Sequence, residues 1–455
     1  MIPTRRKPAG TIFGSTVLII ALLIAAKSVA LLKNMVVAYR FGTSGELDAF
    51  VAAWVACAFF CYVISASFER SFIPAYLKVK LSLSEPAVRR LYSESLAWMA
   101  VGSGALALLV AWKVRAALAV FAPGFEGKQL DLTISLMVWL SPTLAMAGVR
   151  SVWTSVLNAE ERFSVPALSL AITPLLTVMA LLVAGNGTKL MAMTIATLAG
   201  YAVETAFAGA TLRRKGFMLL PSSAGFSPDT RRVFSQLAPM MGGVLIFCAS
   251  PVIDQSMASL LPVGSVSALN YGGTLVGALV ALVDSSLGTA IFPRLARLAG
   301  ENDRPELKRT TLASIGVAAA ATVPFMLVIL FFSPLIIRLM FQRGLFSAAD
   351  MALVSRVQIY WCLEIPFYVA ASILTRLLSS LGGNFETMVI AAVSFAANVA
   401  LNFLFMRWLG LPGIALSTSV VSVITMICCA YGARVLLSRE PETRKSAAET
   451  APLNF

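Results

Sequence analysis

The sequence predicts an all-α, polytopic membrane protein with about twelve transmembrane helices, arranged as two six-helix lobes around a central cavity. Composition is the first reason: 58% of the 455 residues are hydrophobic and only 13% are charged, which is far from the balance of a soluble protein. The apolar stretches are also about 20 residues long, as a helix needs to cross a bilayer. Finally, a segment of the first half recurs in the second half.

The recurring segment begins at a glycine-containing turn and runs through an apolar helix. Phe72-Ile73-Pro74 follows Gly45 at the same distance at which Ile291-Phe292-Pro293 follows Gly264, 219 residues later in the chain. Each copy ends in a basic loop. A parallel repeat of six spans predicts two similar lobes, and internal repeats in an apolar chain are typical of transporters.

Apolar stretches bounded mostly by Gly, Pro or charged residues divide the chain into spans. They must be helical, because lipid offers backbone groups no other hydrogen-bond partner. The predicted spans are residues 12–38, 48–68, 89–112, 130–157, 164–184, 188–211, 232–260, 266–292, 309–333, 351–379, 387–407 and 411–436.

Twelve spans place both termini on one side of the membrane. The predicted loops on that side carry most of the 36 Lys and Arg residues, so the positive-inside rule makes it the cytoplasmic side. Topology and attraction to anionic lipid account for the net charge of +14, and no nucleic-acid partner is expected. The predicted parts are an N-lobe (1–212), a cytoplasmic linker loop (213–231), a C-lobe (232–437) and a cytoplasmic tail (438–455).

Several cations fall within spans of the first half, where a central charge costs roughly 2.5–3.5 kcal/mol. Lys27 and Asn34 lie nearly on one helix face, because seven residues complete almost two turns. Lys33 shares their span, and Arg150 lies in the fourth. These four residues predict a cavity that binds an anionic group such as a phosphate. The alternative is that the cations snorkel to the membrane surface or neutralise Glu204.

The second half carries oxygen-bearing side chains within its spans. Asp254 follows Pro251, which frees a backbone carbonyl, and Asn398 and Asn402 share a face of the eleventh span. Thr418 in the twelfth span is able to join them. A carboxylate, two amides and a hydroxyl suit a hard cation such as Na⁺. Interhelical hydrogen bonds are the alternative on spacing alone.

Residues for acid–base or metal chemistry are scarce. The chain has no histidine, which removes the commonest general base, and all six cysteines fall in apolar spans. They read as small helix-packing residues. No paired carboxylates stand in a predicted outward loop, so neither an enzyme nor a resident cofactor is expected.

Five short motifs follow one another along the chain: F-G-T-S-G-E-L-D-A-F, S-F-I-P-A-Y, F-A-P-G-F, V-L-N-A-E-E-R-F-S-V-P-A and G-S-V-S-A-L-N-Y. In order and spacing they resemble those of the MurJ/MviN family of bacterial lipid II flippases, within the multidrug/oligosaccharidyl-lipid/polysaccharide exporter superfamily. The resemblance extends from about residue 12 to 437. It implies two lobes around a V-shaped cavity with alternating access in the bacterial inner membrane. Many members carry two further helices beyond twelve.

The resemblance assigns roles to residues of the first half, although some charged residues of the family are replaced here. It places two basic positions of the family on Lys27 and Lys33, which keep the charge but lack the bidentate fork of arginine. It places the acid after the first loop on Asp48, which is expected to help close an outer gate. An arginine pair of the family falls on Phe60 and Cys61, where the charge is absent.

In the second half, another arginine position of the family falls on Thr274. The sodium site of some members falls on Asp254, Asn398, Asn402 and Thr418, with Asn402 where an aspartate is seen. The resemblance thus favours Na⁺ binding over purely structural hydrogen bonds at these positions.

The leading prediction is a flippase that moves a polyprenyl-pyrophosphate-linked glycan, lipid II or a related cell-envelope precursor, to the outer leaflet by alternating access. Na⁺ or the membrane potential would drive the return. The expected partners are this glycan, membrane lipids and the cell-envelope synthesis machinery. The missing arginines leave open an exopolysaccharide or O-antigen repeat-unit flippase. A MATE-type multidrug cation antiporter predicts an acidic, aromatic cavity instead, and a scaffold or glycan-polymerising enzyme is a further class.

Overall fold

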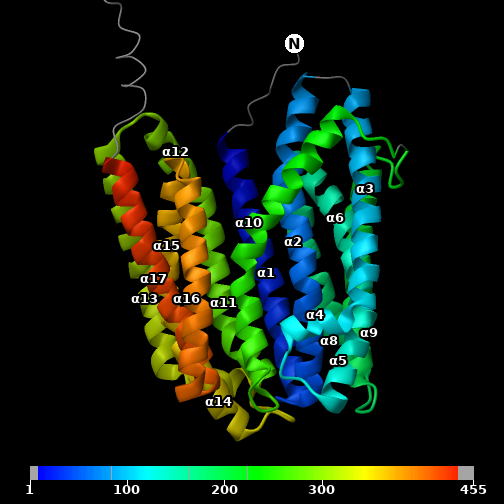
Figure 1. Ribbon diagram of the computed structural model, residues 1–455, viewed down its shortest axis with the longest axis vertical. Coiled ribbons are helices and arrows are strands. Elements are labelled where there is room, and N and C mark those ends of the chain that lie inside the picture. Colours follow the sequence, from blue (N-terminus) through cyan, green and yellow to red (C-terminus); the bar gives the residue numbers. More distant parts are fainter. Residues whose placement is uncertain (1–8, 83–84, 163, 223, 439–455) are drawn as a thin grey trace, which may run out of the picture. The chain divides into compact units, whose positions relative to one another are not determined.

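The computed structural model describes residues 9–82, 85–162, 164–222 and 224–438, and every regular element in these ranges is a helix (Figure 1). The basic start at 5–7 and the predicted tail after Ser438 lie outside them. The helices are α1 (Ala9–Phe41), α2 (Gly45–Ser82), α3 (Glu85–Trp112), α4 (Val114–Phe121), α5 (Gly127–Leu140), α6 (Pro142–Ala159), α7 (Ser164–Ser169), α8 (Ile172–Val183), α9 (Lys189–Arg213), α10 (Pro228–Ala258), α11 (Ser265–Ala290), α12 (Phe292–Gly300), α13 (Arg304–Phe341), α14 (Ala348–Cys362), α15 (Glu364–Ser380), α16 (Asn384–Leu409) and α17 (Leu411–Ser438).

The predicted spans are confirmed as helices. Within the described residues, 11 helical segments are long and apolar enough to cross a membrane, and α10 brings the number to 12 when its two halves, bent by 45°, count as one span. Three spans consist of two consecutive helices each: α5 with α6, α7 with α8, and α14 with α15. The α5–α6 break lies at Ser141, directly before Pro142, which has no N–H to donate to the carbonyl one turn earlier, whereas Ser141 itself keeps helical dihedral angles (φ −55°, ψ −33°).

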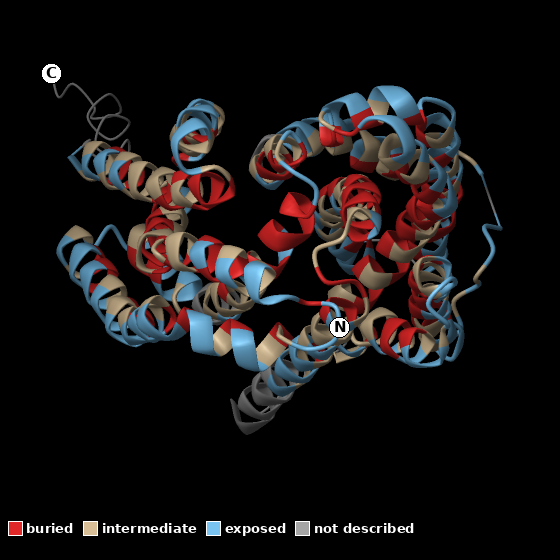
Figure 2. Ribbon diagram, turned by 90° about the horizontal axis from the view of Figure 1, so that it is seen from below, coloured by how far each residue is buried: buried red, intermediate tan, exposed pale blue. Residues whose placement is uncertain are grey.

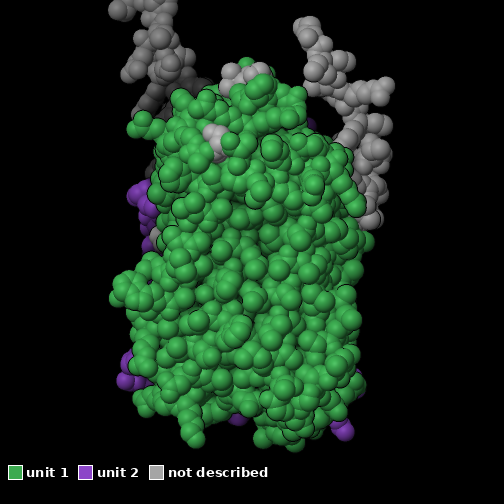
Figure 3. Space-filling model, turned by 90° about the vertical axis from the view of Figure 1, so that its right-hand side faces the viewer, with its two compact units in different colours: residues 1–268, 340–351 green, residues 269–339, 352–455 purple. Residues whose placement is uncertain are grey.

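The chain forms two compact units. Unit 1 consists of residues 1–268 and 340–351 (green in Figure 3). Its central helix is α2, which packs against α3, α5, α6, α9 and α10. Phe68, Phe72 and Tyr76 stack along α2 with ring centroids 5.0 and 5.5 Å apart, because residues four apart share a helix face. Within this unit, buried residues lie on the faces that helices turn toward one another (Figure 2).

Unit 2 consists of residues 269–339 and 352–455. Its helices α15, α16 and α17 pack side by side, and the short helix α12 lies against α15. Leu295 and Leu298 of α12 are buried in the same apolar cluster as Leu374 and Leu378 of α15. This short amphipathic helix thus lies on the span helices of unit 2 and presents its arginines outward.

A buried carboxylate of unit 1 binds the start of α10. Glu94 of α3 is fully buried and accepts hydrogen bonds from the backbone N–H of Ser227 (2.8 Å) and the hydroxyl of Thr230 (2.6 Å). Ser227 is the N-cap of α10. The predicted linker therefore ends on α3, and α10 packs along α2 in unit 1. The predicted division into lobes at 213–231 stays a prediction.

Candidate functional site

The two lysines predicted to bind an anionic group lie on α1. Lys27 is exposed, whereas Lys33 and Asn34 are half-buried. α1 packs against α7 and α8 of the same unit. Lys27 and Asn34 share a face of one continuous helix, as the spacing predicts. Their role as substrate ligands stays a prediction.

Arg150, the third predicted cation, is already paired. Its guanidinium forms an ion pair with Glu204 of α9, a carboxylate that is only 3% exposed. Glu204 also accepts a hydrogen bond from the hydroxyl of Thr173 (2.5 Å), and the guanidinium lies 4.7 Å from the ring centre of Tyr201. The neutralisation of Glu204 considered as the alternative is thus present. Charge pairing satisfies a buried acid that would otherwise be costly in lipid.

Aromatic and small side chains occupy the positions where the resemblance places arginines in α2. The ring of Phe60 contacts those of Phe59 and Phe121, with centroids 5.5 and 5.8 Å apart. Cys61 is 3% exposed, and its sulfur lies 3.9 Å from the hydroxyl oxygen of Thr143. Neither a phenyl ring nor a thiol is able to supply the bidentate contacts of an arginine pair.

Thr274, the third such position, belongs to α11 in unit 2. Its hydroxyl donates to the backbone carbonyl of Asn270 one turn earlier, at 2.9 Å. A threonine that back-bonds in this way satisfies itself within its own helix.

Asp48, the predicted gate residue, is 1% exposed and binds the start of α11. Its carboxylate accepts hydrogen bonds from the backbone N–H of Gly264 (2.6 Å) and of Ser267 (2.8 Å). Gly264 directly precedes α11, and Ser267 is its third residue. These amides have no partner within the helix, so Asp48 supplies from α2 the cap that a helix usually obtains from neighbouring residues. The contact joins the two recurring turns.

Further residues around the α1–α2 turn were not predicted. The hydroxyl of Thr43 donates to Asp350, and the backbone N–H of Leu345 donates to the carbonyl of Tyr39 at 3.0 Å. Lys189 donates to the carbonyl of Arg40 at 3.0 Å. The turn therefore holds the α8–α9 connection and the 340–351 segment in unit 1. Backbone carbonyl acceptors leave no trace in a sequence, whereas Asp350, three residues after Ser347, is a recognisable helix-start signal.

The predicted cation ligands are divided between the units. Asp254, 4% exposed, belongs to α10 of unit 1, and Asn398, Asn402 and Thr418 belong to α16 and α17 of unit 2. The Asn402 amide donates to the Asn398 side-chain oxygen at 3.4 Å, and the hydroxyl of Ser417 donates to the Asn402 side-chain oxygen. Asn398 and Asn402 thus lie beside Ser417 of α17, and the Ser417–Asn402 bond is one of the interhelical hydrogen bonds considered as the alternative. The Thr418 hydroxyl donates to the carbonyl of Ile414 in its own helix, at 3.2 Å. Amide and hydroxyl oxygens of this kind suit a hard cation. Na⁺ binding itself stays a prediction.

Glu160, a carboxylate outside the spans, is stabilised in its charged form at the end of α6. Burial raises the pKa of Glu160, but hydrogen bonds from Lys80 (2.6 Å) and Tyr76 (2.8 Å) together with nearby positive charge outweigh burial and hold this pKa below its usual range. Glu160 therefore ties α6 to the end of α2 as an anion.

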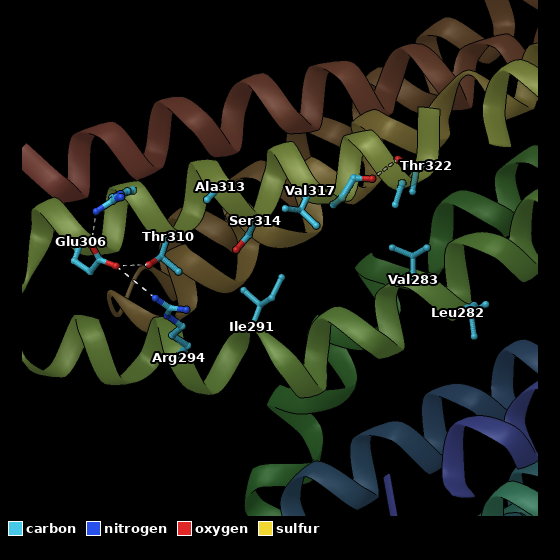
Figure 4. A pocket seen from close by; sticks show the side chains of 13 residues that line it. Leu282, Val283, Ile291, Arg294, Glu306, Thr310, Ala313, Ser314, Val317 and Thr322 are labelled. Carbon is cyan, nitrogen blue, oxygen red and sulfur yellow. Dashed lines mark hydrogen bonds and ion pairs between the residues drawn. The ribbon is translucent and has the colours of Figure 1, made fainter. Parts of the chain in front are cut away.

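Unit 2 contains a groove that the sequence did not predict. It lies between α13 on one side and α11 and α12 on the other, with a volume of about 770 Å³ (Figure 4). Arg294, Glu306 and Thr310 lie at one end, and Leu282 and Val283 lie toward the other. The groove thus has one charged end and a long apolar wall.

The sequence and the fold both match known proteins. The chain matches the family model described as lipid II flippase MurJ over residues 37–443. It is 25% identical over 427 residues to a probable lipid II flippase MurJ of Buchnera aphidicola subsp. Acyrthosiphon pisum, covering 91% of this chain and 80% of the relative. It is 23% identical to the lipid II flippase MurJ of Burkholderia cenocepacia, covering 89% and 80%.

Solved structures share the fold. A lipid II flippase MurJ in an inward closed conformation superposes with a TM-score of 0.82 at 20% identity, covering 92% of this chain and 87% of that one. An inward-facing multidrug resistance transporter of the MATE family, from the MOP superfamily, superposes with a TM-score of 0.73 at 13% identity, covering 96% and 99%.

Proposed function

Because the chain belongs to the lipid II flippase MurJ family, we propose that it moves lipid II from the inner to the outer leaflet of the bacterial inner membrane. The match over residues 37–443 carries this proposal, and the shared fold supports it. The helices place this multi-pass protein in the membrane. We orient both termini toward the cytoplasm, in keeping with the distribution of Lys and Arg.

In the proposed mechanism, Lys27 and Lys33 on α1 attract the pyrophosphate, assisted by Asn34. The polyprenyl tail stays in lipid while the headgroup crosses the membrane. Asp48 keeps the outer side closed until the headgroup is bound. Its two hydrogen bonds to the start of α11 support this gating role, because they have to break before the two turns separate.

Arg150 takes part only when its charge is shared between Glu204 and the substrate. A buried ion pair that loses one partner leaves an uncompensated charge, so Arg150→Ala alone reduces both stability and transport. The double variant Arg150→Ala/Glu204→Gln removes that leftover charge. We expect the double variant to regain stability and to remain poor in transport. Recovery of both would assign Arg150 a structural role only.

The decisive experiment measures flipping of fluorescent lipid II by the purified protein in liposomes. Lys27→Ala is expected to abolish flipping while the protein stays folded, and Lys78→Ala, an exposed lysine of α2, is the matched control. Full activity of Lys27→Ala would remove the proposed phosphate contact. No flipping by the wild-type protein would remove the proposed function.

The apolar surroundings of Phe60 and the burial of Cys61 favour one further candidate, a peptide-free polyprenyl-pyrophosphate glycan of exopolysaccharide or O-antigen type. A smaller, less charged headgroup needs fewer arginine contacts. The two substrates are compared by their affinity for the same purified protein. Tighter binding of the peptide-free glycan would move the function from cell-wall synthesis to polysaccharide export.

A further inference from the structure

We propose that the groove of unit 2 between α13 and the α11–α12 segment binds one anionic glycerophospholipid of the membrane. The phosphate would lie between Arg294 and Arg309, and an acyl chain would lie along the apolar wall (Figure 4). The groove's volume of about 770 Å³ is within the range of about 300–1,000 Å³ typical of pockets for small ligands. This site is separate from the residues assigned to the flipped substrate.

Charge complementarity selects an anion at the polar end. Arg294 of α12 and Arg309 of α13 both approach the carboxylate of Glu306, at 3.4 and 3.9 Å. Two cations sharing one anion leave a net charge of one plus, which matches the single negative charge of a phosphodiester. Glu306 faces the same space and disfavours a dianion. The hydroxyl of Ser314 lines the next turn of the groove and is able to donate to a phosphate or ester oxygen.

The rest of the wall suits a hydrocarbon chain. Ile291, the N-cap of α12, lines it together with Val317, Ala318 and Ala321 of α13, and small alanine side chains leave depth along α13. If the groove opens to the bilayer, as proposed, lipid tails would enter it without crossing water. The charged end therefore matches the headgroup of an amphipathic lipid, and the adjoining apolar wall matches its acyl chain.

The position of α12 puts this headgroup site at the membrane surface. Leu295 and Leu298 are buried, whereas the side chains of Arg294 and Arg297 are 59% and 69% exposed. A short helix with apolar residues inward and arginines outward is typical of the interface between lipid and water, where it attracts anionic lipid. The orientation proposed above enters only in naming the leaflet, which would be the inner one.

The test measures lipid binding to the purified full chain in a neutral detergent by native mass spectrometry and thermal shift. The probes are palmitoyl-oleoyl phosphatidylglycerol, the matching phosphatidylcholine, and dihexanoyl phosphatidylglycerol. Arg294→Gln/Arg309→Gln is expected to weaken phosphatidylglycerol binding by roughly tenfold or more, because two arginines leave the anion. The control Arg89→Gln/Arg115→Gln removes two exposed arginines of unit 1, none of whose residues lines the groove, and it is expected to bind as the wild type does.

A second pair of variants tests the apolar wall. Ala321→Phe fills the groove and should weaken the long-chain lipid while leaving the dihexanoyl lipid unchanged; Ala320→Phe adds the same ring on an exposed neighbouring position outside the lining. The proposal would be overturned if the long-chain phosphatidylglycerol and phosphatidylcholine bound equally well. It would also be overturned if the two double arginine variants changed phosphatidylglycerol binding equally. A dimer of the chain that dissociates with Ala321→Phe would likewise overturn it, since a second copy would then occupy the groove. Lipid binding is measured without transport, so the outcome is independent of the proposed flippase activity.

Discussion

Asp48 combines near-complete burial with two backbone amides as hydrogen-bond donors. A carboxylate in an apolar helix bundle is costly unless its oxygens are satisfied, and the start of α11 satisfies both of them. The donors depend on the acid in return, because the first amides of a helix have no partner of their own. The residue therefore stabilises the junction of α2 with the start of α11.

Replacing Asp48 by alanine is expected to lower stability by roughly 1–3 kcal/mol for each buried amide that loses its acceptor. Asp48→Asn keeps one acceptor oxygen and should therefore lose less stability than Asp48→Ala. Thermal unfolding in detergent measures both. Glu46→Ala is the control, because its contact with Lys189 is 3.7 Å long and its side chain is 53% exposed. Equal melting temperatures for Asp48→Ala and Glu46→Ala would contradict the assigned role.

Glu160 gives a pH dependence whose sign follows from its lowered pKa. A carboxyl group with a folded pKa below the unfolded value stabilises the fold at pH values above the unfolded pKa, and this stabilisation disappears as the pH falls through the folded pKa. The difference in melting temperature between wild type and Glu160→Gln is therefore expected to shrink on acidification from neutral pH. Glu126→Gln, at an exposed carboxylate, is the control. A difference that stays constant with pH would refute the coupling to Lys80 and Tyr76.

Some of these side-chain relations could be predicted and others could not. The proximity of Arg150 and Glu204 was considered from the sequence, because two opposite charges within spans must find partners. The partners of Asp48 are backbone amides, which have no sequence signature, so its gate role came from family resemblance and its contacts from the structure. The groove arginines looked like part of a basic loop, since nothing in their spacing indicated the apolar wall beside them.

At the scale of elements, the membrane helices were predictable and the short helices between them were not. Sustained hydropathy over about 20 residues marks a span strongly. α4 and α12 are too short for that signal and were treated as loops. For α12 a signal existed: Leu295 and Leu298 alternate with Arg294 and Arg297 at helical spacing. Of the three spans that are divided into two helices, one has a sequence signal for its break, because Pro142 begins α6.

The turn before α11 depends on a glycine for geometric reasons. Gly264 has φ of +95°, and a Cβ at this position would lie 2.6 Å from the backbone carbonyl oxygen of Thr43. Gly264→Ala is expected to cost about 1–3 kcal/mol of unfolding free energy, through backbone strain and through displacement of the α1–α2 turn. Gly300→Ala, where the new methyl group meets nothing within 4 Å, is the matched control. Chemical denaturation of both variants decides, and equal midpoints would exclude strain at Gly264.

At the scale of the whole molecule, the sequence predicts Na⁺ binding by Asp254, Asn398, Asn402 and Thr418. A cation that binds the folded protein stabilises it by mass action. Na⁺ is therefore expected to raise the melting temperature more than K⁺ or Li⁺ does, and Asp254→Ala should erase the difference. Asp131→Ala, at an exposed acid of α5, should leave it unchanged. Identical shifts with all three ions would dismiss Na⁺ as the ligand of Asn398, Asn402 and Thr418.

The contact between Asp48 and Ser267 has an evolutionary consequence. The two residues are 219 positions apart, the same interval that separates Gly45 from Gly264, so they are counterparts in the two copies of the repeat. In an ancestral homodimer of identical chains, the same contact would have set one aspartate against another, and like charges in close contact oppose each other. In this chain the first copy supplies the acceptor, and the second supplies backbone donors beside a serine, so no such repulsion arises. The two copies of the repeat are therefore not interchangeable at this position.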